Sequence, residues 1–357
     1  MSLQLERRAS RRLKIGKLQM GGAYPVLVQS MNSRPARDVE GNLEELKRLA
    51  EAGCELSRLA VPSADSLPAF KAIADQSPLP LVADIHFDWK LALGAIEAGA
   101  AALRLNPGNI RDKSGLRQVA REAKAQGIPI RVGVNAGSLS PEILKRFGGP
   151  TAEALKYSAL EAANLLEAEG FDDICLSVKA SHAPLMIEAN QLLAQACDYP
   201  LHLGLTEAGT PKRGAIKSAT ALAPLLLAGI GDTIRVSLTA DPVEEVKAAW
   251  TILESLGLRQ RSAQLISCPG CGRTAVDIRP FAQAVDQYLE DLNQPLTIAV
   301  MGCAVNGPGE AKEADLGLAG GQGEYLLFAK GRPLYKVPED QALDCLKQEI
   351  TKLLEKK

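Results

Sequence analysis

Residues 79–105 read LPLVADIHFDWKLALGAIEAGAAALRL, and the fold of this chain follows from the pattern they contain. A short apolar run, Leu79–Ile85, ends next to polar residues and is followed by a longer Ala- and Leu-rich segment, Trp89–Ala98. A second short run, Ala101–Leu105, comes directly afterwards. Because short apolar runs indicate strands and longer segments of this composition indicate helices, the stretch predicts one βαβ unit.

The same alternation continues on both sides, from Pro25 to Pro242. It predicts eight strands, at Pro25–Met31, Leu56–Val61, Leu79–Ile85, Ala101–Leu105, Ile128–Val134, Ile174–Val178, Leu201–Leu205 and Thr233–Leu238. Eight βα units indicate an α/β fold of the (β/α)8 TIM-barrel type. A doubly wound open sheet is the alternative, but no Gly-rich dinucleotide-binding motif follows the first strand. The preceding segment, Arg12–Gly22, is expected to form a small hairpin that closes the barrel floor.

Bulk composition excludes several classes of protein. The 357 residues carry 41 basic and 42 acidic side chains, so no overall field favours nucleic acid or an anionic membrane. The longest apolar stretch, Ala219–Ile230, is too short to span a bilayer. The arginine-rich amino end lacks the apolar region of a signal peptide and is expected to be a solvated lead-in. Seven scattered cysteines do not resemble a secreted disulfide framework, and we expect a cytoplasmic protein.

Polar residues stand at the carboxyl ends of the predicted strands, which converge on one face of a barrel. Five of them are cationic, namely Arg58, Arg104, Arg131, Lys179 and Arg235. Asp84 and Glu207 could pair with some of these cations inside the barrel, but two carboxylates cannot balance five. The cluster therefore predicts an anionic ligand, and diphosphate suits it because guanidinium groups bind phosphoryl oxygens in pairs. His86 and His202 are equally well explained as hydrogen-bonded wall residues.

A smaller domain is expected after the barrel. A last barrel helix, Val243–Leu256, precedes a linker at Gly257–Gln264, which predicts a barrel domain over residues 1–257 and a small α/β domain over residues 265–357. In the second domain we expect a helix near Pro280–Leu292, a strand at Thr297–Met301, a hairpin over Glu324–Val337 and a final helix.

Three cysteines in this domain have the spacing of an inorganic site. Cys268 and Cys271 are separated by two residues, and Cys303 follows further along the chain. A structural zinc site needs four thiolate or imidazole ligands, yet the three histidines lie far upstream and Cys345 is better explained as a helix-packing thiol. Three thiolates without an obvious fourth favour an iron–sulfur cluster over zinc or a dithiol redox pair, although the cysteines alone leave all three open.

Seven motifs together resemble the 4-hydroxy-3-methylbut-2-enyl diphosphate synthases. They are Val28-Gln29-Ser30-Met31, Asp84-Ile85-His86-Phe87, Arg104-Leu105-Asn106-Pro107-Gly108-Asn109, Arg131-Val132-Gly133-Val134-Asn135, Glu207-Ala208-Gly209, Cys268-Pro269-Gly270-Cys271-Gly272-Arg273, and Met301-Gly302-Cys303 with Val305-Asn306-Gly307-Pro308-Gly309-Glu310. The resemblance covers nearly the whole chain and is most specific in the last two motifs. Without room for an additional middle domain, the chain is similar to the compact bacterial form.

This resemblance implies a reaction and its machinery. The reaction is the two-electron reductive ring opening of 2-C-methyl-D-erythritol 2,4-cyclodiphosphate, with loss of an oxygen as water, in the non-mevalonate isoprenoid pathway. The resemblance further implies a [4Fe-4S] cluster on Cys268, Cys271, Cys303 and Glu310, with flavodoxin or ferredoxin as the electron donor. It also implies a homodimer in which the cluster domain of one subunit covers the barrel mouth of the other.

Residue chemistry is compatible with these implications. A carboxylate binds iron less firmly than a thiolate, so Glu310 is the ligand that substrate would displace most easily. Glu207 is the candidate proton donor, provided that burial raises its pKa. The residues expected to bind substrate are Arg58, Asp84, His86, Arg104, Asn106, Arg131, Asn135, Lys179 and Ser237. A phosphate-ester enzyme with a zinc-stabilised tail, and a tail that binds a protein or RNA partner, are the alternatives from other functional classes.

Overall fold

A computed structural model describes residues 6–106, 113–274, 276–290, 292–303 and 307–355 of the chain. The chain forms two compact units, Met1–Arg259 and Gln260–Lys357. The boundary between them falls inside the segment Gly257–Gln264, which the sequence assigns to the linker.

The first unit is a nearly closed parallel barrel of eight strands, which confirms the predicted TIM-barrel fold. Around the barrel the strands follow one another in chain order, and a single bridge between Leu176, in β8, and Leu201, just before β9, connects the two edge strands of the sheet. The strands are β3 (Leu27–Met31), β4 (Leu56–Ala60), β5 (Leu81–Ile85), β6 (Ala102–Leu105), β7 (Ile130–Asn135), β8 (Ile174–Lys179), β9 (His202–Leu203) and β10 (Thr233–Ile234).

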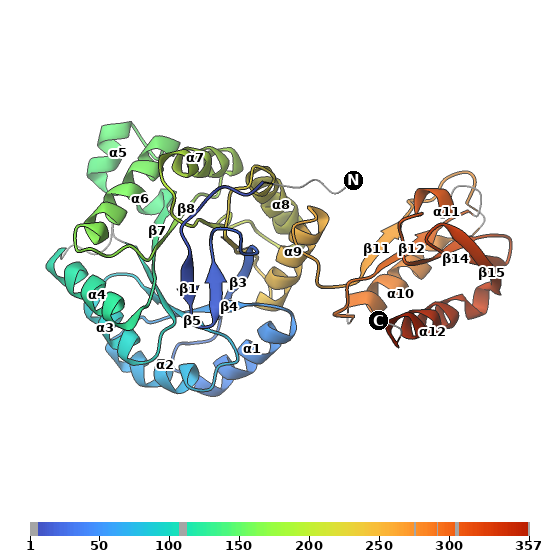
Figure 1. Ribbon diagram of the computed structural model, residues 1–357, viewed down its shortest axis with the longest axis horizontal. Coiled ribbons are helices and arrows are strands. Elements are labelled where there is room, and N and C mark those ends of the chain that lie inside the picture. Colours follow the sequence, from blue (N-terminus) through green and yellow to red (C-terminus); the bar gives the residue numbers. More distant parts are fainter. Residues whose placement is uncertain (1–5, 107–112, 275, 291, 304–306, 356–357) are drawn as a thin grey trace. The chain divides into compact units, whose positions relative to one another are not determined.

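Helices surround these strands, as Figure 1 shows. They are α1 (Val39–Glu51), α2 (Leu67–Ala74), α3 (Trp89–Glu97), α4 (Lys113–Gln126), α5 (Pro141–Phe147), α6 (Ala152–Glu167), α7 (Ala183–Ala196), α8 (Pro211–Leu227) and α9 (Pro242–Ser255). Several begin at a side-chain cap: the carboxylate of Asp38 accepts the Gly41 N–H, and that of Asp88 accepts the Lys90 N–H. Their apolar faces pack on the outward-facing strand residues and form one continuous core.

A two-stranded hairpin closes the barrel floor, as the sequence predicts. Strand β1 (Leu13–Ile15) pairs antiparallel with β2 (Leu18–Met20), and Gly16 occupies the first turn position with a φ of +57°. The inward residues Leu13, Ile15 and Met20 are buried against the bottom ends of the barrel strands, whereas Lys14 and Gln19 between them are exposed.

The arginine-rich amino end is not the solvated lead-in that composition suggests. Arg7 forms an ion pair with Asp232 at 2.8 Å, and the guanidinium of Arg8 donates to the carbonyl of Cys197 at 2.6 Å. The backbone N–H of Arg8 also donates to the carbonyl of Gly229 at 3.0 Å. Cys197 and Gly229 follow the ends of α7 and α8, where helix carbonyls lack partners, so these arginines attach the amino end to the barrel.

The last barrel strand is shorter than the sequence predicts. A strand was expected over Thr233–Leu238, but β10 ends at Ile234. The chain stays in place without a ladder because Arg235 N–H donates to the carbonyl of Leu203 at 3.0 Å, and Leu238 N–H donates to a carboxylate oxygen of Glu245 at 2.9 Å. A side chain of α9 thus takes over the bonding that a neighbouring strand would supply.

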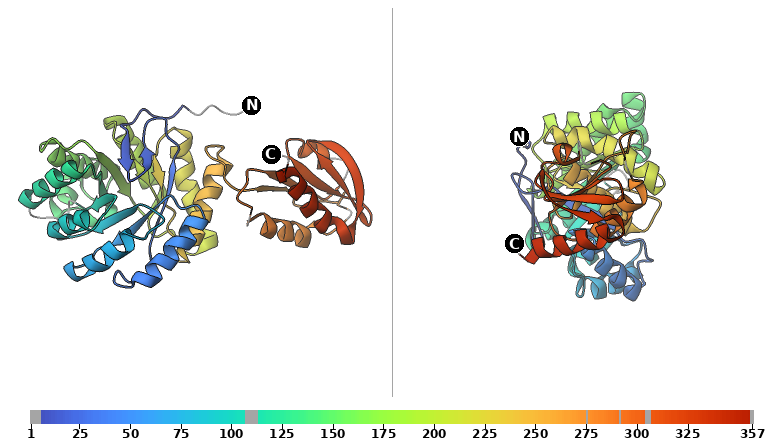
Figure 2. Two further views of the ribbon diagram at one scale, coloured as in Figure 1. Left: turned by 60° about the horizontal axis from the view of Figure 1, so that its bottom comes forward. Right: turned by 90° about the vertical axis from the view of Figure 1, so that its right-hand side faces the viewer.

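The second unit is a five-stranded sheet with helices on its faces. Its strands, in spatial and chain order, are β11 (Gln264–Ser267), β12 (Thr297–Met301), β13 (Leu316–Gly320), β14 (Glu324–Ala329) and β15 (Arg332–Pro338). The first three are parallel, and β14 and β15 form the predicted hairpin around Lys330 and Gly331. Helices α10 (Ile278–Glu290) and α12 (Ala342–Glu355) pack on one face of the sheet (Figure 2), and the four-residue helix α11 (Gly307–Glu310) is near the other.

No helix in the described parts of either unit is long and apolar enough to cross a bilayer.

Candidate functional site

A polar cavity lies at the carboxyl ends of the barrel strands. It contains about 600 Å³ of empty space. Its wall consists of Met31, Arg58, Asp84, His86, Arg104, Arg131, Gly133, Asn135, Ser177, Lys179, His202, Thr206, Arg235 and Ser237. The structure therefore brings together the five cations that the sequence places at the barrel mouth.

Asp84 is the carboxylate at the centre of one side of this wall. Its oxygens lie 3.0 Å from Arg104 Nη1, 3.2 Å from His86 Nε2 and 3.4 Å from Arg58 Nε. Burial alone would raise the pKa of Asp84, but the neighbouring Arg58, His86 and Arg104 outweigh it and hold the pKa below its ordinary value. Asp84 is thus an ionised group shared by two arginines and a histidine.

Arg131 and Lys179 have no carboxylate partner in the described part of the chain. Arg131 donates to the side-chain oxygen of Gln29, and both cations are almost completely buried. Burial lowers the pKa of Arg131 to about 10 and that of Arg58 to about 9, and repulsion from neighbouring arginines contributes in the same direction. Burial and repulsion from four arginines likewise lower the pKa of Lys179 well below its ordinary value. Keeping these groups charged is costly without an anion.

Several buried polar atoms in the wall or directly behind it lack a hydrogen-bond partner within the described residues. They are Gln29 Nε2, Arg58 Nε, Arg131 Nη2 and His202 Nε2. Burial and the nearby cations also lower the pKa of His202 well below its ordinary value, so its imidazole is neutral at physiological pH, with Nδ1 2.6 Å from Thr233 Oγ1. Buried donors without partners are rare in folded proteins, and a cluster of them indicates a ligand site.

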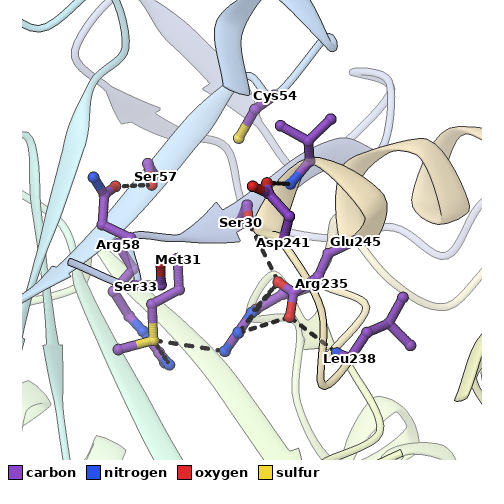
Figure 3. Close-up of polar contacts among 12 residues, drawn as sticks. Ser30, Met31, Ser33, Cys54, Ser57, Arg58, Arg235, Leu238, Asp241 and Glu245 are labelled. Carbon is purple, nitrogen blue, oxygen red and sulfur yellow. Dashed lines mark hydrogen bonds and ion pairs between the residues drawn. The ribbon is translucent and has the colours of Figure 1, made fainter. Parts of the chain in front are cut away.

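Arg235 has a carboxylate partner that sequence reasoning missed. Glu245, on α9, lies 3.2 Å from both Nε and Nη2 of Arg235 (Figure 3). The sequence offered one signal, because Glu245 shares its helix face with the buried residues Ala249 and Leu253. With Asp84 and Glu245 as counter-charges, three of the five cationic charges at the mouth stay unbalanced. This arrangement suits a small anion that carries two or three negative charges.

The remaining predicted residues of the barrel differ in their placement. Asn135 and Ser237 line the cavity. Asn106 is buried and donates to Ser138 Oγ at 3.1 Å, outside the cavity wall. Glu207 is exposed, so the burial on which its proposed role depends is absent from the isolated chain. Its backbone nevertheless adopts a φ of +54°, an uncommon conformation for a residue other than glycine and one often found at functional sites.

The cysteine motifs lie at the ends of neighbouring parallel strands in the second unit. Ser267 pairs with Val300, so Cys268 and the segment Gly302–Cys303 leave β11 and β12 at the same edge of the sheet. The backbone N–H of Gly302 donates to Cys268 Sγ at 3.1 Å. A Cβ at Gly302 would lie only 2.9 Å from two side-chain atoms of Thr274 and 3.3 Å from Cys268 Sγ, so a larger residue here would displace the Thr274 side chain.

Cys271 is exposed in the loop between these elements. Thr274 Oγ1 accepts its backbone N–H at 2.7 Å, and hydrogen bonds from the backbone and then the side chain of Arg273 lower the pKa of its thiol. Cys268, Cys271, Cys303 and Cys345 are all free thiols. Glu310 ends the helix α11 and is exposed.

No three His, Cys, Asp or Glu side chains among the described residues are close enough together to hold a metal ion. The donor set still fits an iron–sulfur cluster better than zinc. It consists of thiols without an imidazole among them, and a backbone N–H already directed at the sulfur of Cys268, the kind of hydrogen bond that tunes such clusters. Cys345 is not part of this set, because it lies on α12 beside Tyr335 and against the domain core.

Family models match both units of the chain. The GcpE TIM-barrel domain matches residues 10–250, and the GcpE protein C-terminal domain matches residues 264–352. The chain belongs to the GcpE family. The family resemblance inferred from the seven motifs is therefore confirmed.

Relatives in the GcpE family are similar over almost their full length. The protein of Macrococcus caseolyticus (strain JCSC5402) is 51% identical over 98% of this chain and 94% of its own. That of Caldanaerobacter subterraneus subsp. tengcongensis is also 51% identical, over 98% of both chains. Both are named 4-hydroxy-3-methylbut-2-en-1-yl diphosphate synthase (flavodoxin).

Solved structures show the barrel fold alone. The spore coat polysaccharide biosynthesis protein spsE from Bacillus subtilis is 13% identical, with a TM-score of 0.50 over 70% of this chain and 74% of that protein. The structural similarity supports the barrel architecture of this GcpE chain. At such a low sequence identity it says nothing about the chemistry of the barrel.

Proposed function

We propose that this protein is a 4-hydroxy-3-methylbut-2-enyl diphosphate synthase. It opens the ring of 2-C-methyl-D-erythritol 2,4-cyclodiphosphate with two electrons and two protons, and releases (E)-4-hydroxy-3-methylbut-2-enyl diphosphate and water. The observation that carries the proposal is the pairing of two features in one chain: an anion cavity with three unbalanced cations, and a set of thiols at one sheet edge. Full-length relatives bearing this enzyme's name support the same activity.

The residues of the cavity bind and orient the substrate. Arg58, Arg131 and Lys179 supply donors to the diphosphate, and their buried position strengthens each contact by excluding water. Arg104 and His86 are held by Asp84, which fixes the shape of this wall. Asn106, Asn135 and Ser237 complete the proposed set of substrate-binding residues.

The second unit would hold a [4Fe-4S] cluster through Cys268, Cys271, Cys303 and Glu310. When bound, the cluster supplies low-potential electrons and a Lewis-acidic iron to the carbon–oxygen bond that breaks. The chain contributes the N–H of Gly302 to Cys268 Sγ and a carboxylate, Glu310, that exchanges more easily than a thiolate. Flavodoxin or ferredoxin is the proposed electron donor, and a cytoplasmic homodimer the proposed assembly.

Glu207 is the proposed proton donor to the leaving oxygen. It follows Thr206, a cavity residue, and its left-handed backbone turns the chain at the cavity edge. Because Glu207 is exposed in the single chain, its role requires that substrate or a second subunit cover it.

Two substitutions separate the binding site from the cluster. Arg131→Ala should lower kcat/KM about 10- to 150-fold, since it removes charge-assisted hydrogen bonds, while the visible spectrum of the anaerobic protein stays unchanged. Cys271→Ser should remove both the spectrum and the turnover. The assay is anaerobic reduction of the cyclodiphosphate with a low-potential reductant. Wild-type turnover in Arg131→Ala would contradict the placement of the substrate in the barrel.

A further inference from the structure

Glu245 occupies a position behind the cavity wall that the reaction does not use directly. It projects from the first turns of α9, its side chain is 5% exposed, and it is not a lining residue of the cavity. Arg235 stands between this carboxylate and the cavity. Glu245 therefore makes no direct contact with a ligand in the cavity, and its contact with the cavity wall is through Arg235.

Every polar group that faces Glu245 is a donor. Arg235 contributes Nε and Nη2 at 3.2 Å, Ser30 Oγ lies at 3.3 Å and Leu238 N–H at 2.9 Å. These groups come from three segments: β3, the chain just after β10, and the loop before α9 (Figure 3). One ionised carboxylate thus connects the segments that form this side of the mouth.

The backbone around Arg235 depends on this contact. Beyond Ile234 the chain has left the parallel ladder, and the Leu238 N–H donates to Glu245 rather than to a strand. With Nε and Nη2 held by Glu245, Arg235 directs Nη1 toward Met31 Sδ, 3.6 Å away. The same sulfur accepts from Nη2 of Arg58 at 2.8 Å, so Met31 lies between two of the cavity cations.

We propose that Glu245 is a positioning residue for the anion site: it fixes the guanidinium of Arg235 against the diphosphate of the substrate. The inference rests on the proposed function, because it requires that Arg235 contact the diphosphate. A fixed guanidinium loses less conformational entropy on binding than a mobile one.

Charge and position predict opposite effects when Glu245 is changed. Removing a negative charge near the cavity would, by electrostatics alone, strengthen the binding of an anion. Releasing Arg235 from its fixed orientation would weaken it. The change Glu245→Asp separates the two effects further, because aspartate keeps the charge but is one methylene shorter and cannot reach all four donors.

The experiment measures the dissociation constant of 2-C-methyl-D-erythritol 2,4-cyclodiphosphate by calorimetry, without reductant, for full-length protein carrying its cluster. Arg235→Ala, Glu245→Gln and Glu245→Asp should each weaken binding about tenfold or more. Glu244→Gln is the matched control: this neighbour on α9 is half exposed, with Lys247 Nζ 3.8 Å away, and its change should leave the affinity within about twofold of wild type. Circular dichroism verifies that each variant is folded.

The double variant Arg235→Ala/Glu245→Gln decides whether Glu245 acts through Arg235. It should bind no more weakly than Arg235→Ala alone, since the arginine to be positioned is already gone. Unchanged or tighter binding in Glu245→Gln, or additive losses in the double variant, would overturn the positioning role while leaving the anion site intact. Normal binding by Arg235→Ala would overturn the inference at its premise, and absence of binding by wild-type protein would overturn the proposed function itself.

Discussion

Lys179 places an ammonium group in a wall that already holds four guanidinium groups. Burial and then the repulsion from these arginines lower its pKa well below 10.5. A bound diphosphate supplies the missing negative charge and should raise this pKa toward its ordinary value. Across the pH window between the two pKa values, the lysine of the complex is then protonated more fully than that of the free protein, so binding takes up protons.

Proton uptake is measurable by titrating the cyclodiphosphate into the protein in two buffers with different heats of ionisation. At pH values between the pKa of the free lysine and its higher pKa in the complex, the wild-type protein should take up protons on binding, with the largest uptake midway between the two pKa values. Lys179→Met keeps the length of the side chain and removes its titration, so the proton uptake should fall by the contribution of this lysine. Equal uptake by both proteins would show that Lys179 does not face the anion.

Glu310 is proposed as the displaceable ligand of the cluster. Glu310→Gln should keep most of the iron, because three thiols remain, yet lose most turnover. Glu310→Cys should bind iron at least as tightly and be nearly inactive, since thiolate holds iron more firmly than carboxylate. Iron content and anaerobic turnover of both variants test this. Normal turnover by Glu310→Cys would mean that the fourth ligand need not exchange.

At the scale of single residues, the sequence predicted most of the side chains that line the cavity, but it did not predict that Glu245 binds Arg235 from behind the cavity wall. Arg58, Asp84 and Lys179 could be found because strand ends of a barrel meet on one face. Glu245 was not predicted as a site residue, because its favourable interaction with the helix dipole already explains a glutamate in the first turn of a helix. Its partner Arg235 is ten positions away and on another element, a pairing that no local pattern reveals.

At the scale of elements, the observed bounds match the predicted bounds where the apolar pattern of the sequence agrees with the packing of the fold. Strand β12 begins and ends where predicted, and the hairpin β1–β2 closes the barrel as expected. Strand β10 is shorter than predicted, and within the predicted range the N–H of Leu238 donates to the carboxylate of Glu245 instead of to a neighbouring strand. Strand β11 lies partly in the segment predicted to be linker, because its pairing with β12 depends on residues more than thirty positions away.

The floor hairpin gives a prediction at this scale. Ile15 is 5% exposed and packs in the cluster at the bottom of the barrel, so Ile15→Ala should lower the free energy of unfolding by about 2–5 kcal/mol. Lys14→Ala, on the exposed side of the same strand, should change it by less than about 0.5 kcal/mol. Urea unfolding followed by circular dichroism compares the two. Equal stability of both variants would show that the hairpin does not belong to the barrel core.

The whole molecule combines a barrel unit, which contains the cation-lined cavity, with a smaller unit that carries the thiols of Cys268, Cys271 and Cys303. The sequence predicted a barrel domain over residues 1–257 and a small α/β domain over residues 265–357, because the last barrel helix is followed by a short linker. No pattern within one sequence predicts whether the cluster domain of one subunit serves the barrel of another. That arrangement is a proposal.

Mixing two variants with complementary defects tests cooperation between subunits. Arg131→Ala binds substrate weakly and is assayed at a low substrate concentration, where its own turnover is small, and Cys271→Ser lacks the cluster. If the cluster domain of one subunit serves the barrel of the other, random mixed dimers contain one intact site, and the mixture should recover about a quarter of wild-type activity. If each chain works alone, the mixture should stay inactive.

The central claim is that one chain unites a diphosphate cavity with an iron–sulfur cluster to reduce the cyclodiphosphate. The most direct test is to purify the wild-type protein without oxygen, measure its iron and sulfide, and assay it with the cyclodiphosphate and a low-potential reductant. We predict brown protein with about four iron and four sulfide per chain, and stoichiometric formation of (E)-4-hydroxy-3-methylbut-2-enyl diphosphate. Colourless protein with one tightly bound zinc, or cluster-loaded protein that leaves the cyclodiphosphate unchanged, would contradict the claim.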